Sequence, residues 1–530
     1  MIKPNPSLQL LRSLALLKTK NLNRLNKTKR KFASQHKIGM ISNADLLRLY
    51  RDQLKRKKIK ANSALASLLQ KRKIRTLSGV APIAVLTKPY PCPGKCIYCP
   101  TEKNMPKSYL SNEPAVMRAI ATKFDPFKQV TARLRALTDN GHETDKLELI
   151  VMGGTWSCLP RTYQNWFIKR CFEAANGRVA KNLIQAQILN ESAKHRIIGL
   201  TLETRPDYIN EDEIKYWRKL GATRVELGVQ SVDDEILNSS ERGHGAKEII
   251  RATKLFKQAG FKVAYHLMPN LPGATPTKDL ANFKKLFSNE NFQPDMIKIY
   301  PTVVTKNSKL YGLWKKGGYQ PYSNKQLLNL LLKTKLAVPE YVRIIRLIRD
   351  IPKESIEAGN LISNLRENLK IELKKQGKFC RCIRCREVRE EIKGANKSKL
   401  FITKYQASGA TEYFLQYASN NKRKLFAFLR LRLPRNEKNF IPEIQNSAMI
   451  REVHTYGRLI PINKGESGVQ HIGLGSKLMQ QAEEVAAKNG FSKIAVISGV
   501  GVRGFYCKLG YKQEGTYMLK PLNNQKLAKN

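Results

Sequence analysis

Short hydrophobic runs alternate with longer stretches of helical periodicity between about residues 76 and 350. Stretches such as Glu211–Leu220 and Ala246–Ala259 space their apolar residues as one face of a helix requires. The hydrophobic runs predict strands at Leu147–Met152, Ile197–Leu202, Arg224–Val229, Lys262–Met268 and Met296–Tyr300. Repeated strand–helix units predict an α/β fold with a parallel sheet, closed fully or partly into a barrel.

The pattern changes beyond about residue 401. Strands are predicted at Lys424–Leu433, Ile450–Tyr456 and Ile494–Val500. A helix is predicted at Leu474–Lys488, and a shorter one at Arg503–Leu509. These elements predict a second α/β domain that follows the barrel.

The first 75 residues are rich in lysine and arginine and contain only two acids, Asp45 and Asp52. Leucines recur there at mixed helical spacing, which predicts short amphipathic helices with basic outer faces. A surface of this kind neutralises phosphates without regard to sequence. A solvated or membrane-apposed face is the alternative, but the segment lacks aromatic membrane anchors, so the pattern favours nucleic acid.

The length of 530 residues suits about three domains. We predict a basic helical region at 1–75, a barrel domain at 76–375, a charged connector at 376–400 and a last domain at 401–530. The net charge of +54 extends through all of them and predicts a polyanionic partner, with a basic proteome or salt adaptation as the alternative.

Cysteine usage and hydropathy bear on the compartment. Most of the nine cysteines are clustered and follow no secretory leader, which predicts a reducing, cytoplasmic setting. No apolar run approaches the roughly twenty residues that span a bilayer, so no membrane partner is expected.

One loop carries the strongest chemical signal. Cys92, Cys96 and Cys99 lie within eight residues beside proline and glycine. Three thiolates at this spacing can hold three irons of a 4Fe-4S cluster and leave the fourth open to S-adenosylmethionine. A structural zinc site would need a fourth nearby ligand, and disulfides would need pairs. The spacing therefore predicts a cluster that cleaves S-adenosylmethionine to a radical.

Polar motifs follow several predicted strands. Gly153, Gly154 and Thr155 end one strand, where glycine lets the backbone approach a ligand closely. Glu203 and Gln230 lie at the ends of later strands and offer polar groups to the same mouth. We assign these five residues to S-adenosylmethionine, although each motif alone is also compatible with a structural turn.

A glycine-rich turn opens the predicted helix at Leu474. The segment from Gln470 to Gly475 presents successive backbone N–H groups and the positive end of a helix to a pyrophosphate. It lacks the glycine spacing of dinucleotide-binding and P-loop motifs, and it resembles the acetyl-CoA loop of GNAT acetyltransferases. Tyr506 lies where that fold closes its cofactor site and can protonate a leaving thiolate, with a packed aromatic as the alternative.

A second cysteine triplet, Cys380, Cys382 and Cys385, lies in the connector. Three thiolates this close suit zinc with a fourth ligand from elsewhere, which would staple the connector between the two domains. Reduced or reactive thiols are the alternative, and the fourth ligand stays open.

Ordered blocks from about residue 76 to 525 resemble the catalytic subunit of Elongator and its single-chain bacterial and archaeal relatives, the tRNA uridine(34) acetyltransferases. Those before residue 250 are Met117–Ile120, Asp125–Phe127, Val151–Thr155, Glu203–Tyr208, Gly228–Ser231 and Arg242–His244. Those after it are Tyr300–Thr302, Arg349–Pro352, Arg451–Gly457 and Ile497–Gly501.

The resemblance implies a radical SAM barrel fused to a GNAT domain. It implies cluster ligands at the first cysteine triplet and a catalytic role for Lys146, which would bring the coenzyme to the radical site, and for Tyr506. The implied acetyl-CoA contacts, together with the glycine turn, are Lys146, Glu452, Val453, His454, Thr455, Gln470, Gly473, Leu474, Gly475, Ser476 and Tyr506.

The implied reaction begins when the reduced cluster cleaves S-adenosylmethionine to a radical that takes hydrogen from the methyl group of acetyl-CoA. The resulting carbon radical adds to position 5 of the wobble uridine, and thioester hydrolysis leaves carboxymethyluridine. The implied partners are the anticodon stem-loop of tRNA and a reductant for the cluster. The short first cysteine spacing and the second triplet indicate a prokaryotic single-chain enzyme that does not require accessory Elongator subunits.

Two other functions remain open at this point. A protein lysine acetyltransferase would use the barrel only as a scaffold, but the basic surface would repel a basic protein tail. A non-enzymatic tRNA-binding scaffold that senses acetyl-CoA would bind RNA without cleaving S-adenosylmethionine.

Overall fold

A computed structural model describes residues 6–16, 21–70, 79–388, 394–435, 438–456 and 473–522. The basic run at 71–73 and the predicted coenzyme residue Gln470 lie outside these ranges. Among the described helices, none is long and apolar enough to cross a membrane.

The first sheet is a parallel half-barrel. Its strands are β1 (Ala81–Leu86), β2 (Lys146–Met152), β3 (Arg196–Thr204), β4 (Arg224–Gln230), β5 (Lys262–Leu267), β6 (Met296–Ile299) and β7 (Arg343–Arg346). They pair in sequence order, each parallel to the next. The described strands β1 and β7 do not pair with each other, so the barrel stays open on one side. The predicted parallel sheet is confirmed, and β1 and β7 are additional strands.

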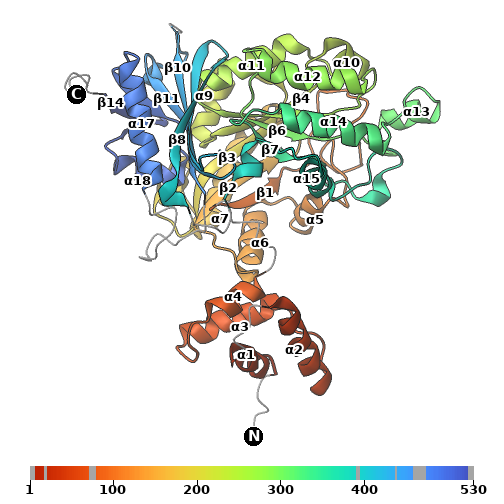
Figure 1. The fold of residues 1–530 in the computed structure, drawn as a ribbon, viewed down its shortest axis with the longest axis vertical. Helices are drawn as coiled ribbons and strands as arrows, with labels where there is room; N and C mark the ends of the chain where they lie inside the picture. Colours follow the sequence, from red (N-terminus) through yellow and green to blue (C-terminus); the bar gives the residue numbers. More distant parts are fainter. Residues whose placement is uncertain are drawn as a thin grey trace.

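The helices of this domain lie around the half-barrel, and α13 projects away from it (Figure 1). They are α5 (Pro114–Ala121), α6 (Pro126–Asp139), α7 (Arg161–Asn176), α8 (Leu183–Glu191), α9 (Glu211–Leu220), α10 (Asp234–Ser239), α11 (Ala246–Gln258), α12 (Pro276–Ser288), α13 (Lys309–Lys315) and α14 (Asn324–Ala337). Strand β2 shows how the two faces differ, because Leu147, Leu149 and Val151 are buried while the alternating residues are only partly so. The partly exposed face, which includes Ile150 and Met152, lines the interior.

The second sheet is mixed and lies beside the half-barrel (Figure 1). Its strands are β8 (Lys399–Ala407), β9 (Ala410–Ala418), β10 (Leu425–Pro434), β11 (Ala448–Thr455), β12 (Lys493–Val496), β13 (Lys512–Glu514) and β14 (Tyr517–Pro521). Only β11 and β12 pair in parallel, and the helix α17 (Leu474–Lys488) lies between them in the chain. The helix α18 (Arg503–Cys507) follows β12 and ends earlier than predicted.

The predicted strand Ile494–Val500 is wrong at its end. Strand β12 stops at Val496, and the chain continues into a 3-10 helix, η8 (Val500–Val502), that packs on β3. A side chain at Gly499 would collide with the backbone of Ile198, and a Cβ at Gly501 would lie 2.6 Å from that of Arg196. The chain leaves the sheet because this segment forms part of the contact between the two domains.

Four helices precede the barrel: α1 (Pro6–Leu16), α2 (Leu22–Gln35), α3 (Asn43–Lys55) and α4 (Ser63–Leu69). They bury their own leucine core and form a lobe at one end of the molecule (Figure 1). Gln70 donates a hydrogen bond to the carbonyl of Gly141 at 3.0 Å, and Arg51 donates to that of Thr138, so the lobe rests on the end of α6. The predicted short helices are confirmed.

A buried ionic cluster joins the half-barrel to the second sheet. Arg451 of β11 donates to Asp295, just before β6, at 3.0 Å and to Glu412 of β9 at 2.9 Å. The ammonium group of Lys257 in α11 lies 3.7 Å from Glu412. Burial opposes ionisation of Asp295, but the neighbouring Arg451, Lys257 and Arg430 outweigh it and hold its pKa below the ordinary value.

Lys257 is fully buried, and burial lowers its pKa from 10.5 to about 8. The unfolded chain therefore binds this proton more tightly than the folded protein, so the contribution of Lys257 to stability rises with pH between about 8 and 10.5. We expect Lys257→Met to remove up to about 3 kcal/mol of this rise in the free energy of unfolding. Urea unfolding of both proteins across this pH range tests the expectation, and parallel pH profiles would contradict it.

Candidate active site

The loop after β1 brings the first cysteine triplet to the carboxyl end of the barrel. Cys92, Cys96 and Cys99 all line one cavity of about 740 Å³. Two guanidinium groups, of Arg205 and Arg242, lie beside the sulfur of Cys96. Three thiols that face one cavity beside cationic groups are a donor set that fits the three thiolate ligands of a 4Fe-4S cluster.

Gly153 and Gly154 lie at the carboxyl end of β2, beside the cysteine loop. Both have backbone conformations that disfavour side chains, with φ of 129° and 101°. A side chain at Gly153 would collide with the hydroxyl of Thr87. The next residue, Thr155, places its hydroxyl 3.9 Å from the sulfur of Cys92. The structure thus brings the predicted glycine motif and the predicted cluster ligands together.

Glu203 and Gln230 line the same cavity, as predicted, from the ends of β3 and β4. Burial raises the pKa of Glu203 to about 7, and the hydroxyl of Tyr109 donates to its carboxylate at 2.9 Å. Gln230 has a φ of 71°, which is uncommon for a residue with a side chain and fits a strained position at a ligand site.

A chain of charged side chains inside the barrel was not predicted. Lys298 of β6 donates to Glu226 of β4 and lies 3.8 Å from Glu203. The ring of His266 in β5 lies 3.0 Å from Glu226, and burial lowers its pKa to about 4, so it is neutral near pH 7. The available signal was the recurrence of charged residues at alternate positions of strands that are otherwise apolar, such as Arg224 and Glu226.

Glu203, Glu226 and His266 lie close enough together to hold a cation. The ammonium group of Lys298 occupies that role, because it contacts both carboxylates. The group is therefore an internal ion-pair network and not a metal site.

The cavity runs along the barrel axis. Its lining extends from the cysteines to Pro82 and Arg224, near the amino ends of β1 and β4. The cationic side chains that line it are Lys107, Arg118, Arg133, Arg205, Arg224, Arg242, Lys298, Arg346 and Arg349. The acidic ones are Glu113, Glu203, Glu226 and Asp350. The excess of positive charge favours anionic ligands.

Lys146 lies at the amino end of β2, at the opposite end of this strand from Gly153. Seven residues of strand separate the ends by about 20 Å. Its register position puts it on the same face as Ile150 and Met152, which line the cavity. Lys146 can therefore hold a coenzyme only at the far end of the barrel, on the side of the second domain.

The strand β11 carries four predicted coenzyme residues, Glu452 to Thr455. Its ladder with β12 covers only Ala448 to Ile450, so β11 runs on past the end of its partner. Helix α17 begins at this gap: a Cβ at Gly475 would lie 3.6 Å from the side chain of Thr455. The predicted residues Gly473, Leu474, Gly475 and Ser476 thus lie at the start of α17, next to the end of β11.

The side chain of Glu452 is engaged elsewhere. It accepts from Arg430 at 2.9 Å and lies 3.7 Å from Lys262 at the amino end of β5. His454 is packed against the rings of Phe428 and Tyr456. Of these two residues, the backbone is better placed than the side chain to meet a coenzyme.

Tyr506 of α18 is buried, and burial raises its pKa. The nearby Phe505 is partly exposed and lies 4.0 Å from the position of a Cβ at Gly475. The structure therefore brings α18, the helix that carries Tyr506, near the start of α17.

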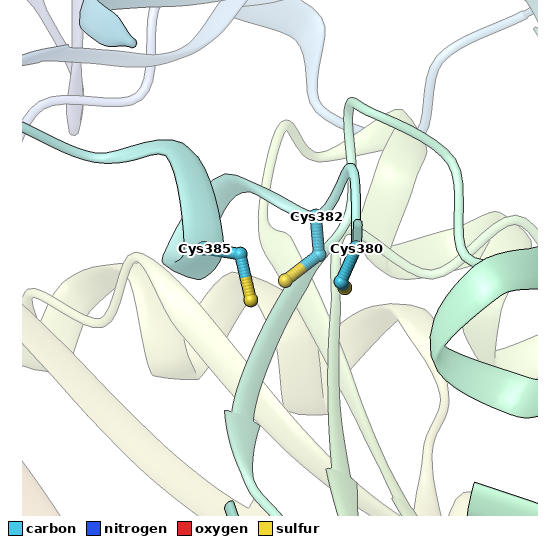
Figure 2. A group of neighbouring side chains, drawn as sticks. All are labelled: Cys380, Cys382 and Cys385. Carbon is cyan, nitrogen blue, oxygen red and sulfur yellow. The ribbon is translucent and has the colours of Figure 1, made fainter. Parts of the chain in front are cut away.

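The second cysteine triplet lies after the helix α15 (Leu365–Lys375). Cys380 and Cys382 precede the helix α16 (Ile383–Arg386), and Cys385 lies within it. Figure 2 shows Cys380, Cys382 and Cys385 side by side, and their sulfur atoms lie within 4.8 Å of one another. The ammonium group of Lys335 in α14 donates to the sulfur of Cys385 at 3.6 Å, which favours a thiolate there. These three thiols are close enough together to hold a metal ion.

Comparisons with known proteins agree with this geometry. The Radical SAM superfamily profile matches residues 90–285, and the Radical_SAM C-terminal domain profile matches residues 294–375. The tRNA uridine(34) acetyltransferase of Methanocaldococcus infernus is 44% identical over 92% of both chains. Human Elongator complex protein 3 is 39% identical over 86% of both chains. The chain belongs to the family of tRNA uridine(34) acetyltransferases and Elongator complex protein 3.

A solved family member has the same fold. The structure of Methanocaldococcus infernus Elp3 with an N-terminal deletion (1–46) superimposes with a TM-score of 0.74 and 42% identity. It covers 84% of this chain and all of the solved one.

The sequence of this chain did not predict the contacts that Arg205 and Arg242 make with Cys96. Both stood in motifs that carried the resemblance, but neither was assigned a contact. Each guanidinium lies beside the sulfur of Cys96, at 3.8 and 3.3 Å respectively. Only the folded chain shows this, because more than a hundred residues separate each arginine from the cysteine.

Two glycines provide a test of how tightly the cavity wall is built. We expect Gly153→Ala to destabilise the protein by more than about 3 kcal/mol, because it combines strain with a collision against Thr87. Gly177→Ala is the matched control: it has a φ of 72° but open space around it, and should cost about 1 kcal/mol. Thermal denaturation of both variants measures the difference, and equal losses would show that the wall yields.

Proposed function

We propose that this chain carboxymethylates position 5 of the wobble uridine in tRNA, with acetyl-CoA as the carbon donor. When bound, the 4Fe-4S cluster and S-adenosylmethionine supply the one-electron chemistry that activates an acetyl methyl group. The observation that carries the proposal is the single cavity that runs from the cysteine loop toward the amino ends of the barrel strands. Relatives named tRNA uridine(34) acetyltransferase support the choice of substrate.

The half-barrel holds the radical chemistry at its carboxyl end. Cys92, Cys96 and Cys99 would hold the cluster. Gly153, Gly154 and Thr155, with Glu203 and Gln230, would hold S-adenosylmethionine, because they line the same mouth or border it. Burial of Glu203 and Tyr109 excludes water, which protects a reactive group from side reactions.

The second domain would have the GNAT fold and bind acetyl-CoA. The edge of β11 from Glu452 to Thr455 lies beyond the described ladder with β12 and would offer backbone groups to the pantetheine arm, and the start of α17 would offer N–H groups to the pyrophosphate. The ion pair between Glu452 and Lys262 connects this edge to the amino end of β5 in the half-barrel. An extended coenzyme arm would therefore pass Lys146 and enter the barrel from that end.

The helical lobe at the amino terminus would bind the tRNA. Arg24, Lys27, Arg30 and Lys31 are all exposed on α2, and this helix contains no acidic residue. Their spacing places most of them along one side of the helix, which suits a phosphate backbone. Bases of the anticodon loop can be splayed into a cavity, as single-stranded RNA recognition requires.

We propose that Cys380, Cys382 and Cys385 hold a zinc ion that fixes the connector, with the fourth ligand left open. Each thiolate would ligate at about 2.3 Å, which the close approach of the three sulfurs allows. The bond from Lys335 to Cys385 would neutralise part of the charge that three thiolates bring to one ion.

Metal analysis tests the zinc site. We expect a single zinc ion per chain in the purified protein, and loss of that zinc with a lower melting temperature in Cys382→Ser. Cys507→Ser is the control, because Cys507 is exposed and lies outside the triplet. Wild-type protein without zinc, or a Cys382→Ser variant that retains it, would contradict the assignment.

Anaerobic reconstitution tests the main proposal. Protein with a reconstituted cluster is mixed with tRNA, acetyl-CoA, S-adenosylmethionine and dithionite, and the nucleosides are analysed by mass spectrometry. We expect carboxymethyluridine from the wild type and at least a hundredfold less from Cys96→Ala, with tRNA binding unchanged. The control is Cys171→Ala, which removes a buried cysteine of α7 outside the cavity and should keep the activity.

The same assays distinguish the proposed reaction from the two alternative functions, a protein lysine acetyltransferase and a tRNA-binding scaffold. Product from Cys96→Ala would exclude the radical mechanism. Acetyl transfer to lysine without S-adenosylmethionine would indicate a protein acetyltransferase, and tRNA binding without any cleavage of S-adenosylmethionine would indicate a scaffold. Activity of the purified chain alone, with dithionite as the electron donor, would show that accessory subunits are not required.

A further inference from the structure

Two arginine side chains converge on one of the three cluster cysteines. Arg242 donates to the sulfur of Cys96 at 3.3 Å, and Arg205 donates to it at 3.8 Å. All three side chains are more than nine-tenths buried. Such contacts in a site of low dielectric constant act strongly on a charged sulfur.

Both guanidinium groups are held from behind. Arg205 donates to both oxygens of Asp207, at 3.0 and 2.9 Å, and to the backbone carbonyl of Arg242 at 2.8 Å. Arg242 donates to the backbone carbonyl of Gly228. The two side chains therefore have little freedom to turn away from Cys96.

Glycines make room for both groups. A side chain at Gly94, inside the cysteine loop, would collide with the guanidinium of Arg205. A Cβ at Gly228 would lie 2.8 Å from that of Arg242, and one at Gly243 would lie 3.4 Å from that of Arg205. Three segments that are distant in the sequence thus leave space for the same pair of cations.

The two arginines differ in their counter-charges. Arg205 forms an ion pair with Asp207, so its charge is largely compensated. Arg242 forms no ion pair with a carboxylate in the part of the chain that the structure describes. Its positive charge is therefore directed at the cysteine sulfurs.

We propose that Arg242 raises the reduction potential of the cluster through Cys96. Arg205, fixed by Asp207, holds Arg242 in place. Reduction adds one electron to a cluster that already carries negative thiolates. A buried cation and an N–H bond to a ligand sulfur stabilise the reduced form more than the oxidised form. Arg242 is thus a positioning and tuning residue, and it makes the cluster easier for a low-potential donor to reduce.

The proposal rests on the cluster assigned to the cysteine loop, and not on the RNA substrate or acetyl-CoA. Its test therefore omits both. The reconstituted protein is titrated with dithionite against redox mediators, and the reduced cluster is followed by electron paramagnetic resonance. The midpoint potential is compared among variants that contain the same amount of iron per chain.

We expect Arg242→Gln to lower the midpoint potential, because the charge is lost while a weaker donor remains. A tenfold change in the reduction equilibrium corresponds to about 59 mV for one electron, and we expect a shift of at least this size. Arg242→Lys keeps the charge and should recover most of the wild-type potential. Arg224→Gln is the control, since it removes a cation from the same cavity without a contact to a cysteine.

Asp207→Asn provides a shift of opposite sign. It removes the counter-charge of Arg205 while keeping the shape of the side chain, so the midpoint potential should rise. This variant tests the effect of a buried cation on the sulfur of Cys96 with Arg242 left in place, so the electrostatic basis of the proposal stays testable if Arg242→Gln assembles no cluster. An unchanged midpoint potential in Arg242→Gln or in Asp207→Asn, with full iron content, would overturn the proposal. A wild-type protein that assembles no cluster would overturn the cluster assignment as well.

Discussion

The position of the second sheet depends on the buried ionic cluster around Asp295 and Arg451. Hydrogen bonds at 3.0 and 2.9 Å fix Arg451 between a carboxylate of the half-barrel and one of the second sheet, Glu412. Charges buried this deeply are costly unless each finds its partner, so the ionic cluster favours the arrangement of the two domains that pairs them. Lys257, with its depressed pKa, shows the cost of that burial.

This arrangement places the domain junction and the cysteine loop at opposite ends of the half-barrel. The junction lies at the amino ends of the strands, because Asp295 precedes β6 and Lys262 begins β5. The cysteine loop lies at the opposite end, after β1. Two ligands that react must meet, so acetyl-CoA held by the second domain, as proposed above, would have to reach through the barrel. The elongated shape of acetyl-CoA suits such a path.

The barrel interior can be charged rather than apolar because its buried charges also pair with one another. Glu203, Glu226 and Lys298 satisfy one another within the wall, so their cost of burial is offset while the lining stays polar. The glycines at positions 94, 153 and 228 then let guanidinium groups and backbone approach the mouth closely. Pocket shape and charge thus come from several strands at once.

The sequence by itself determined the parallel strands, the cysteine loop and the glycines of β2, because periodicity and close spacing are local properties of the chain. Only the tertiary structure decided where β12 ends, since η8 leaves the sheet to pack on β3. It also decided that Lys146 lies at the far end of the barrel, that Glu452 pairs with Arg430, and that Arg242 meets Cys96. Each of these depends on contacts between segments far apart in the chain, which no local pattern encodes.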